Sequence, residues 1–403
     1  DVAAIVLEDN RLQTLALSIA ERGGAAALPP LARAIEVLEE SGRLNRAVEG
    51  LDSNDDLLRR AKENQGLTRP ELAVLLSTSK LALQDAIEGS PLADDPSLTP
   101  DLFAIFPEAM RERHEQAILG HRLRREIIAT TIANRFVNRL GLLAPFALTE
   151  EEGASWAQVA AGFVAAERLF DMAPLWRDIE TYEGPEAVRL ELFDRAAAGL
   201  RLHIADIVRS TAPSVPPGEI VALLRPGIAK LDATLDELLR AEPRAQANAI
   251  AADLLARGAP PGIVDRIVRL FKLNGAIGIA ALGRRRGTDE VALTRAYTRL
   301  GEALGLDWAQ SAANRFQARD PWESLLAASL ARDFEQLRLQ FLDRNGGADP
   351  EKEVAKWVNI QAHRVKQFLR MIQRMRTASV TTLPMIAEAA NQARVLLARH
   401  TES

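Results

Sequence analysis

HRLRREIIATTIANRFVNRL, residues 121–140, is the stretch that decides the fold. At 100° per residue, its apolar side chains cover one broad side of a helix and much of the opposite side. A helix that is apolar nearly all round needs packing partners nearly all round. Its threonines and asparagines are poor helix formers, so we expect tertiary contacts to hold this segment helical.

A narrow polar strip remains on this helix. Thr131, Asn134, Arg135 and Asn138 are spaced i, i+3, i+4 and i+7, so their side chains share one face. Buried polar side chains usually find partners inside the fold, and we therefore interpret the strip as hydrogen bonds between packed helices. A ligand or an interdomain contact is the alternative. The four residues are candidates for a buried polar or interdomain contact.

Composition describes a globular chain that is long enough for two lobes, with 403 residues of which 47% are hydrophobic. Its 50 basic and 55 acidic residues give a net charge of −5, which favours neither nucleic acid nor an anionic membrane as a partner. No apolar run approaches the roughly 20 residues of a membrane-spanning helix. The absence of cysteine excludes disulfides and thiolate metal sites, and fits a cytoplasmic location.

Helical patterns follow one another along the chain with short connectors. The clearest start signal is Thr68-Arg69-Pro70-Glu71, which has the form of a capping box with proline in the first turn. No strand pattern rich in Val or Ile alternates with the helices, so we predict an all-α, multi-helix, bundle-like array without a substantial sheet. The chain opens on Asp1 already inside a helical pattern, and we expect it to be part of a longer polypeptide.

The proline-rich segment Thr211 to Gly218, TAPSVPPG, is the best candidate for a boundary. We therefore predict a first helical lobe at residues 1–210, a connector at 211–218 and a second helical lobe at 219–403, with the two lobes packed together.

Motifs for a reaction centre are missing at the spacings that chemistry requires. Gly275, Gly278 and Gly283 do not have the G-x-G-x-x-G spacing after a strand, so close helix packing is the interpretation. His114 and His121 are seven residues apart, whereas a helical zinc site needs two histidines at i and i+4. No serine stands in a G-x-S-x-G elbow. We predict no catalytic, cofactor-binding or metal-binding residue in this chain.

Three basic clusters could bind phosphate. They lie at residues 122–125, 284–286 and 364–376. Aromatic residues are not interleaved with them as base stacking would require. We interpret these clusters as solvated faces, charges at helix C-termini or interface salt bridges.

Five blocks carry a resemblance to a known family. The chain resembles the C-terminal region of the large bacterial NAD-specific glutamate dehydrogenases at Gly66–Ile87, which begins GLTRPELAVLLSTSKLAL, and at Arg122–Asn138, RLRREIIATTIANRFVN. The other matching blocks are LEDNRLQTLALS at Leu7–Ser18, GASWAQVAAGFVAAERLFDMAPLW at Gly153–Trp176 and LGEALGLDWAQ at Leu300–Gln310. The resemblance spans nearly the whole chain and is looser after Thr211.

The resemblance implies an enzyme that oxidatively deaminates L-glutamate to 2-oxoglutarate with NAD. It places the catalytic lysine, the aspartate and the nucleotide-binding lobe in a central domain upstream of Asp1, and no residue here matches those motifs. We therefore expect a non-catalytic helical C-terminal domain that packs on the upstream catalytic domain of the same polypeptide, in an enzyme that forms homo-oligomers. Its expected role is structural, in assembly, or regulatory. An independent helical protein-binding scaffold, and an enzyme with its site inside the bundle, are the alternatives.

Overall fold

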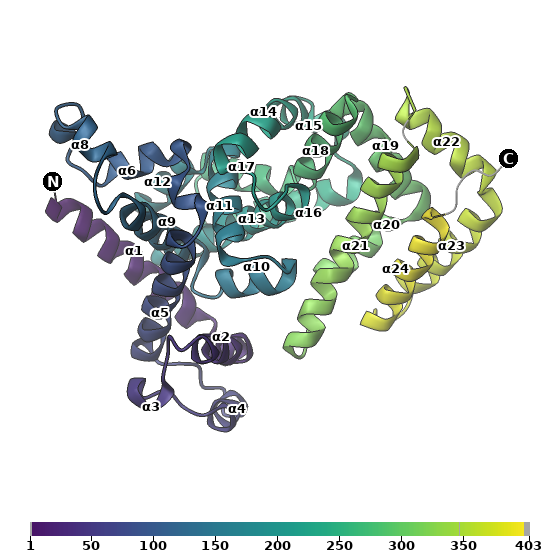
Figure 1. Ribbon diagram of the computed structural model, residues 1–403. Coiled ribbons are helices and arrows are strands. Elements are labelled where there is room, and N and C mark those ends of the chain that lie inside the picture. Colours follow the sequence, from purple (N-terminus) through teal and green to yellow (C-terminus); the bar gives the residue numbers. More distant parts are fainter. Residues whose placement is uncertain (1, 346, 399–403) are drawn as a thin grey trace. The chain divides into compact units, whose positions relative to one another are not determined.

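The computed structural model describes residues 2–345 and 347–398, and every regular element in these ranges is a helix (Figure 1). The all-α prediction is confirmed. The chain contains two compact units, the first made of residues 1–222 and 253–270 and the second of residues 223–252 and 271–403. The packing of two lobes about a connector at residues 211–218 stays a prediction.

The first unit contains residues 121–140 and the helices that surround them. They are α1 (Val2–Arg22), α2 (Leu28–Glu40), α3 (Arg46–Glu49), α4 (Asn54–Lys62), α5 (Arg69–Glu88), α6 (Thr99–Ala104), α7 (Glu108–Arg111), α8 (Glu115–Leu119), α9 (Arg124–Leu140), α10 (Ala144–Glu152), α11 (Trp156–Leu169), α12 (Met172–Glu180) and α13 (Glu186–Ser210), with short 3-10 turns η1 (Gly24–Ala27), η2 (Pro91–Asp94) and η3 (Pro96–Leu98). Helix α9 packs on α5, α1, α6, α13 and α11.

Helix α9 is shorter at its start than the sequence suggests. It begins at Arg124, because the Nδ1 atom of His121 accepts the backbone amide of Leu123 at 3.1 Å and the preceding residues turn instead of continuing the helix. Beyond that turn the apolar residues behave as expected, since Ile128, Ile132 and Phe136 are fully buried. Tertiary packing on six neighbouring helices, α10 included, therefore accompanies a sequence of modest helix propensity.

Side-chain caps fix where the neighbouring helices begin. At α5 the predicted capping box is present, and the Glu71 carboxylate accepts the backbone amide of Thr68 at 2.6 Å. Arg60 also binds Glu71, and although burial raises the pKa of Glu71, these hydrogen bonds lower it to about 2. A second capping box joins Ser155 and Gln158 at the start of α11. This second box was not predicted from the sequence.

The second unit contains the later helices, and three helices contribute residues to both units. In chain order the remaining helices are α14 (Pro217–Ala233), α15 (Leu235–Leu238), α16 (Ala241–Ala256), α17 (Pro261–Lys272), α18 (Ala276–Arg286), α19 (Glu290–Leu304), α20 (Leu306–Asn314), α21 (Pro321–Asn345), α22 (Pro350–Ile360), α23 (Ala362–Arg376) and α24 (Leu383–Leu397). Pro226 lies inside α14 and does not end it. Within the described ranges, no helix combines the length and the apolar character that crossing a membrane requires.

Candidate functional site

The four residues of the predicted polar strip lie in different surroundings on α9. The Thr131 hydroxyl donates a hydrogen bond to the carbonyl of Ile127 in its own helix at 2.7 Å. Asn134 is half-buried, and the described part of the chain gives its side chain no hydrogen bond. Arg135 and Asn138 instead contact residues of other helices. The structure thus brings two of the four residues into contacts between helices.

Arg135 is held between two buried carboxylates. Its guanidinium pairs with Asp101 of α6 and, through Nε, with Glu167 of α11 at 2.7 Å. It also lies over the ring of Phe163, 5.7 Å from the ring centroid. Burial lowers the pKa of Arg135, but Glu167 and Asp101 together raise it above its usual value. The guanidinium therefore stays charged, and α9 is linked to α6 and α11.

Glu167 is shared between two arginines and a tryptophan. Its carboxylate binds Arg139 of α9 at 2.9 Å in addition to Arg135, and accepts a hydrogen bond from the indole of Trp176 at 3.2 Å. Arg139 in turn lies over the Trp176 ring at 5.6 Å. The Glu167 side chain is buried and all of these contacts converge on it. One carboxylate thus joins α9, α11 and α12.

Asp101 extends the same cluster on the other side. Arg168 of α11 binds Asp101 at 2.9 Å and donates hydrogen bonds to the hydroxyl and the carbonyl of Ser97. Ser97 is fixed in turn by Asp95, which accepts its backbone amide at 2.8 Å. We call Asp101, Arg135, Arg139, Glu167 and Arg168 the α9 network. Sequence reasoning identified Arg135 alone, because the other members come from separate helices or, like Arg139, lie outside the strip.

The chemistry open to the α9 network is limited by its composition. Three of its five members are arginines, whose guanidinium groups do not give up protons in proteins. Its two carboxylates each bind two arginines. Such a cluster can brace helices against one another and fix their register.

A second polar cluster lies where α1, α5 and α9 meet. The amide of Asn138 donates to Asp9 of α1 at 3.2 Å, and Gln13 donates to the other oxygen of Asp9 at 2.9 Å. Lys80 of α5 is buried, and Nζ has no hydrogen-bond partner among the described residues. Burial lowers the pKa of Lys80 to about 8, against the opposing attraction of Asp9. This junction holds a charge that its surroundings do not fully compensate.

The histidines that the structure describes are not gathered into a metal site. His203 is fully buried, stacks on Phe170 at 3.7 Å and places Nε2 3.0 Å from the carbonyl of Leu270. Burial lowers its pKa to about 4, so the ring is neutral near pH 7. Among the residues that the structure describes, no three His, Asp or Glu side chains are placed to hold a metal ion.

The three glycines of the 275–283 segment do not form a nucleotide cradle. Gly275 precedes α18 with a φ of +82°, and Gly278 and Gly283 lie inside that helix. A Cβ atom on Gly278 would come within 2.6 Å of Leu339, and one on Gly283 within 3.0 Å of Glu290. A phosphate-binding turn would instead present open backbone amides between a strand and a helix. These residues fit helix packing and do not fit NAD.

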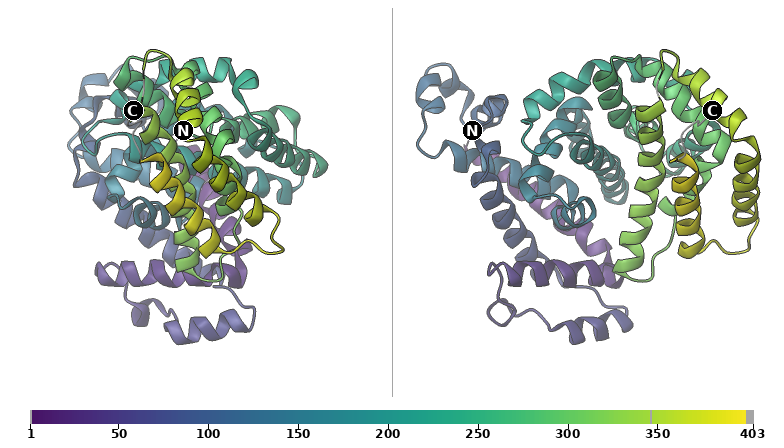
Figure 2. Two further views of the ribbon diagram at one scale, coloured as in Figure 1. Left: turned by 90° about the vertical axis from the view of Figure 1, so that its right-hand side faces the viewer. Right: turned by 45° about the vertical axis from the view of Figure 1, so that its right-hand side comes forward.

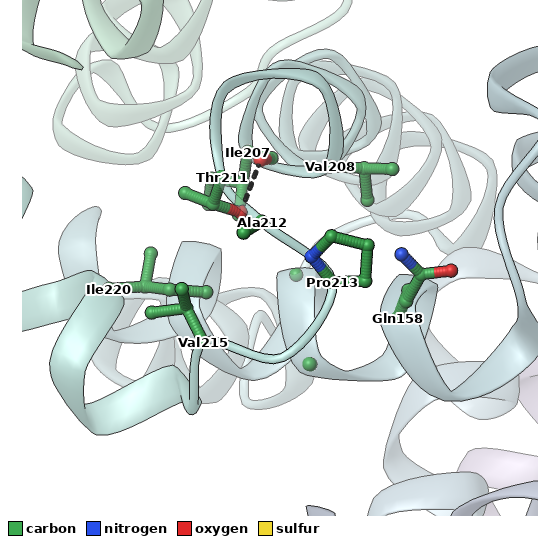
Figure 3. Close-up of a pocket in the computed structure, with 10 residues that line it drawn as sticks. Gln158, Ile207, Val208, Thr211, Ala212, Pro213, Val215 and Ile220 are labelled. Carbon is green, nitrogen blue, oxygen red and sulfur yellow. Dashed lines mark hydrogen bonds between the residues drawn. The ribbon is translucent and has the colours of Figure 1, made fainter.

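A small pocket in the first unit lies between the end of α13 and the start of α11. Gln158, Val208 and Pro213 are among its lining residues (Figure 3). Its cavity volume is about 10 Å³, which is close to the minimum that holds one water molecule. The pocket is therefore too small for an amino acid or a nucleotide.

The fold and the charge network define an all-α domain in which buried ion pairs hold several helices together. Residues 64–394 match the family model described as glutamate dehydrogenase, C-terminal, and the chain belongs to this family. The recognition made from the sequence blocks is confirmed.

Three bacterial relatives, each called NAD-specific glutamate dehydrogenase, show how much of such a protein the chain covers. The Pseudomonas aeruginosa protein is 32% identical over 96% of this chain and 24% of its own length. The proteins of Mycobacterium tuberculosis and Halomonas elongata are 28% and 27% identical, over 98% and 97% of this chain and 25% of their own lengths. The chain therefore spans about a quarter of the length of these relatives.

Proposed function

We propose that this chain is the non-catalytic, helical C-terminal domain of a large NAD-dependent glutamate dehydrogenase. The parent reaction is the oxidative deamination of L-glutamate to 2-oxoglutarate, and NAD binds in the upstream catalytic domain. The observation that carries the proposal is the match to the C-terminal family together with the quarter share of the relatives. We place this chain in the cytoplasm, because its own 403 residues contain no cysteine.

The role we propose is structural: the domain packs on the upstream catalytic domain and contributes to the assembly of a homo-oligomer. The α9 network supports this role, because paired guanidinium and carboxylate groups give a rigid body rather than a reaction centre. Thr131, Asn134, Arg135 and Asn138 belong to this proposal as residues that support folding or docking.

Turnover and association test the proposal separately. The 403-residue chain should show no NAD reduction with L-glutamate, whereas the full-length enzyme should. Co-expression of the upstream part with this chain should give a stable complex on size-exclusion chromatography. Glutamate-dependent NAD reduction by the chain alone would contradict the non-catalytic role. Failure of the two parts to associate would favour an independent protein-binding scaffold.

A further inference from the structure

One segment of the second unit has a charge opposite to that of the chain as a whole. Residues 354–387 contain no Asp or Glu and six Lys or Arg. Removing these six from the 50 basic residues of the chain leaves 44 against 55 acidic residues, a balance of −11 for the remainder. Such a separation of charge within one chain marks a surface suited to an oppositely charged partner.

Helix α23 arranges the cations of this segment in a line. Lys366, Arg370 and Arg374 follow one another at intervals of four residues, about 6 Å of helix rise, and all three are exposed. We call these three residues the basic face. The opposite side of the helix is buried, with Val365, Phe368, Met371, Ile372 and Met375 turned inward. Figure 2 shows α23 and α24 running alongside each other, in yellow.

The side chains of the basic face differ from other arginines of the second unit in their ion pairing. Arg285, Arg299 and Arg394 bind Asp343, Glu351 and Asp333 at 2.7, 3.1 and 2.6 Å. By contrast, no carboxylate is paired with the basic face among the residues that the structure describes. Like charges four residues apart on a helix repel each other and lower its stability. An anionic partner would relieve that repulsion.

The surroundings of the basic face narrow the chemistry of the partner. The apolar side of α23 packs on α19 and α24 and is not free to enter a membrane. Phe368 of α23 is buried, so its ring is not available for base stacking. Two of the three cations are arginines, whose planar groups bind carboxylates in a bidentate manner. A carboxylate-rich protein surface fits these features best.

We propose that the basic face of α23 docks on an acidic surface in the part of the longer polypeptide that this chain does not span. The inference rests on the proposed function, since the relatives have about three quarters of their length outside the matched region. It adds to that function the contact surface and its chemistry: arginine and lysine on this chain against aspartate and glutamate on the upstream part.

The test is the affinity between the upstream part and this chain, with and without reversal of the basic face. Lys366→Glu, Arg370→Glu and Arg374→Glu together should weaken binding on the order of 10- to 100-fold at 50 mM salt, and should remove most of its salt dependence. The matched control is Lys62→Glu, Arg113→Glu and Arg122→Glu, three exposed cations reversed with the same change in net charge. The control should bind nearly as the parent does.

A second measurement uses the intact enzyme. Acetylation of Lys366 by an N-hydroxysuccinimide ester should be slower in the full-length protein than in the isolated chain, while that of exposed Lys352 should be equal in both. If parent parts associate but the reversed variant binds as tightly as the control, the basic face is not the contact and the proposed function stands. If the parent parts fail to associate, both proposals fail. Equal rates of Lys366 acetylation in the full-length protein and in the isolated chain would also overturn the inference. So would slower acetylation of Lys366 that is seen only when the chain self-associates or when polyphosphate is added.

Discussion

In the first unit, three half-buried arginines share two buried carboxylates, whereas in the second unit α21 carries a single buried arginine with unlike partners. Arg338 is almost fully buried, and it binds Asp307 at 2.5 Å, pairs with Gln310 and lies 4.1 Å from the ring centroid of Tyr297. In the α9 network each carboxylate binds two arginines, so the loss of one carboxylate would leave two half-buried cations without that partner. A carboxylate shared by two arginines can thus make the first unit more sensitive to a single substitution than the second.

Removal of Glu167 should give the largest effect. Glu167→Ala leaves Arg135 and Arg139 without the carboxylate they share, and we expect the first unit to lose about 3–5 kcal/mol of unfolding free energy. Native-state hydrogen exchange should show this as faster exchange in α9 and α11, with a smaller change in α21. Glu40→Ala, which removes an exposed carboxylate from the same unit, is the control. Equal losses of protection in α9 and α21 would break the comparison between the units.

Replacement of Lys80 should give the next largest change in unfolding free energy, and this change should be stabilising. Burial lowers its folded-state pKa from 10.5 to about 8, a difference that corresponds to roughly 3 kcal/mol. Below pH 8 Lys80 is charged in the folded protein, and its burial then lowers the unfolding free energy by that full amount. Between pH 8 and 10.5 the unfolded state binds more protons than the folded state, so stability should rise with pH. Lys80→Met should therefore stabilise the first unit near pH 7 and remove this rise.

Urea unfolding from pH 7 to pH 10 measures the contribution of Lys80. Lys62 is exposed on α4, so Lys62→Met should leave the pH dependence unchanged. If the unfolding free energy of Lys80→Met still rises between pH 8 and 10, a group other than Lys80 causes the pH dependence. The measurement thus distinguishes Lys80, which has no hydrogen-bond partner among the described residues, from the arginines of the α9 network, which are paired with carboxylates.

Arg338 should give a smaller loss than Glu167. Arg338→Met removes the buried charge itself and leaves Asp307, whose side chain is 23% exposed and can regain water. We expect a loss of about 2 kcal/mol, from the hydrogen bonds and the contact with Tyr297. Hydrogen exchange in α21 and α20 measures it. A loss in the second unit as large as that of Glu167→Ala in the first would show that sharing of carboxylates does not matter.

Sequence patterns predicted the helices better than the network between them. The capping box at Thr68 and Glu71 and the buried face of α9 follow from local spacing, and both are present. Asp101 and Glu167 could not be found in that way, because each lies far along the chain from Arg135 and becomes a partner only after three helices pack. The separate helices α7 and α8 were also missed, since their apolar residues continue the pattern that leads into α9.

The smallest expected change in stability concerns Asn134 and Asn138, which the sequence could not distinguish. Asn138 is buried and donates to Asp9, whereas Asn134 is half-buried and receives no hydrogen bond from the residues described. Asn138→Leu removes one of the two hydrogen bonds to Asp9, while Gln13 still donates the other. We therefore expect Asn138→Leu to cost about 1 kcal/mol and Asn134→Leu less than about 0.5 kcal/mol.

Thermal unfolding and association with the upstream part should both be measured on this pair of variants. Asn138→Leu should melt lower and exchange amides faster in α1, because the α1 contact is the one that it loses. Equal melting temperatures for the two variants, with unchanged exchange in α1, would mean that the hydrogen bond to Asp9 contributes nothing to the junction. If Asn134→Leu alone weakens association with the upstream part, the half-exposed side of the strip is the docking surface and the buried side only holds α1 in place.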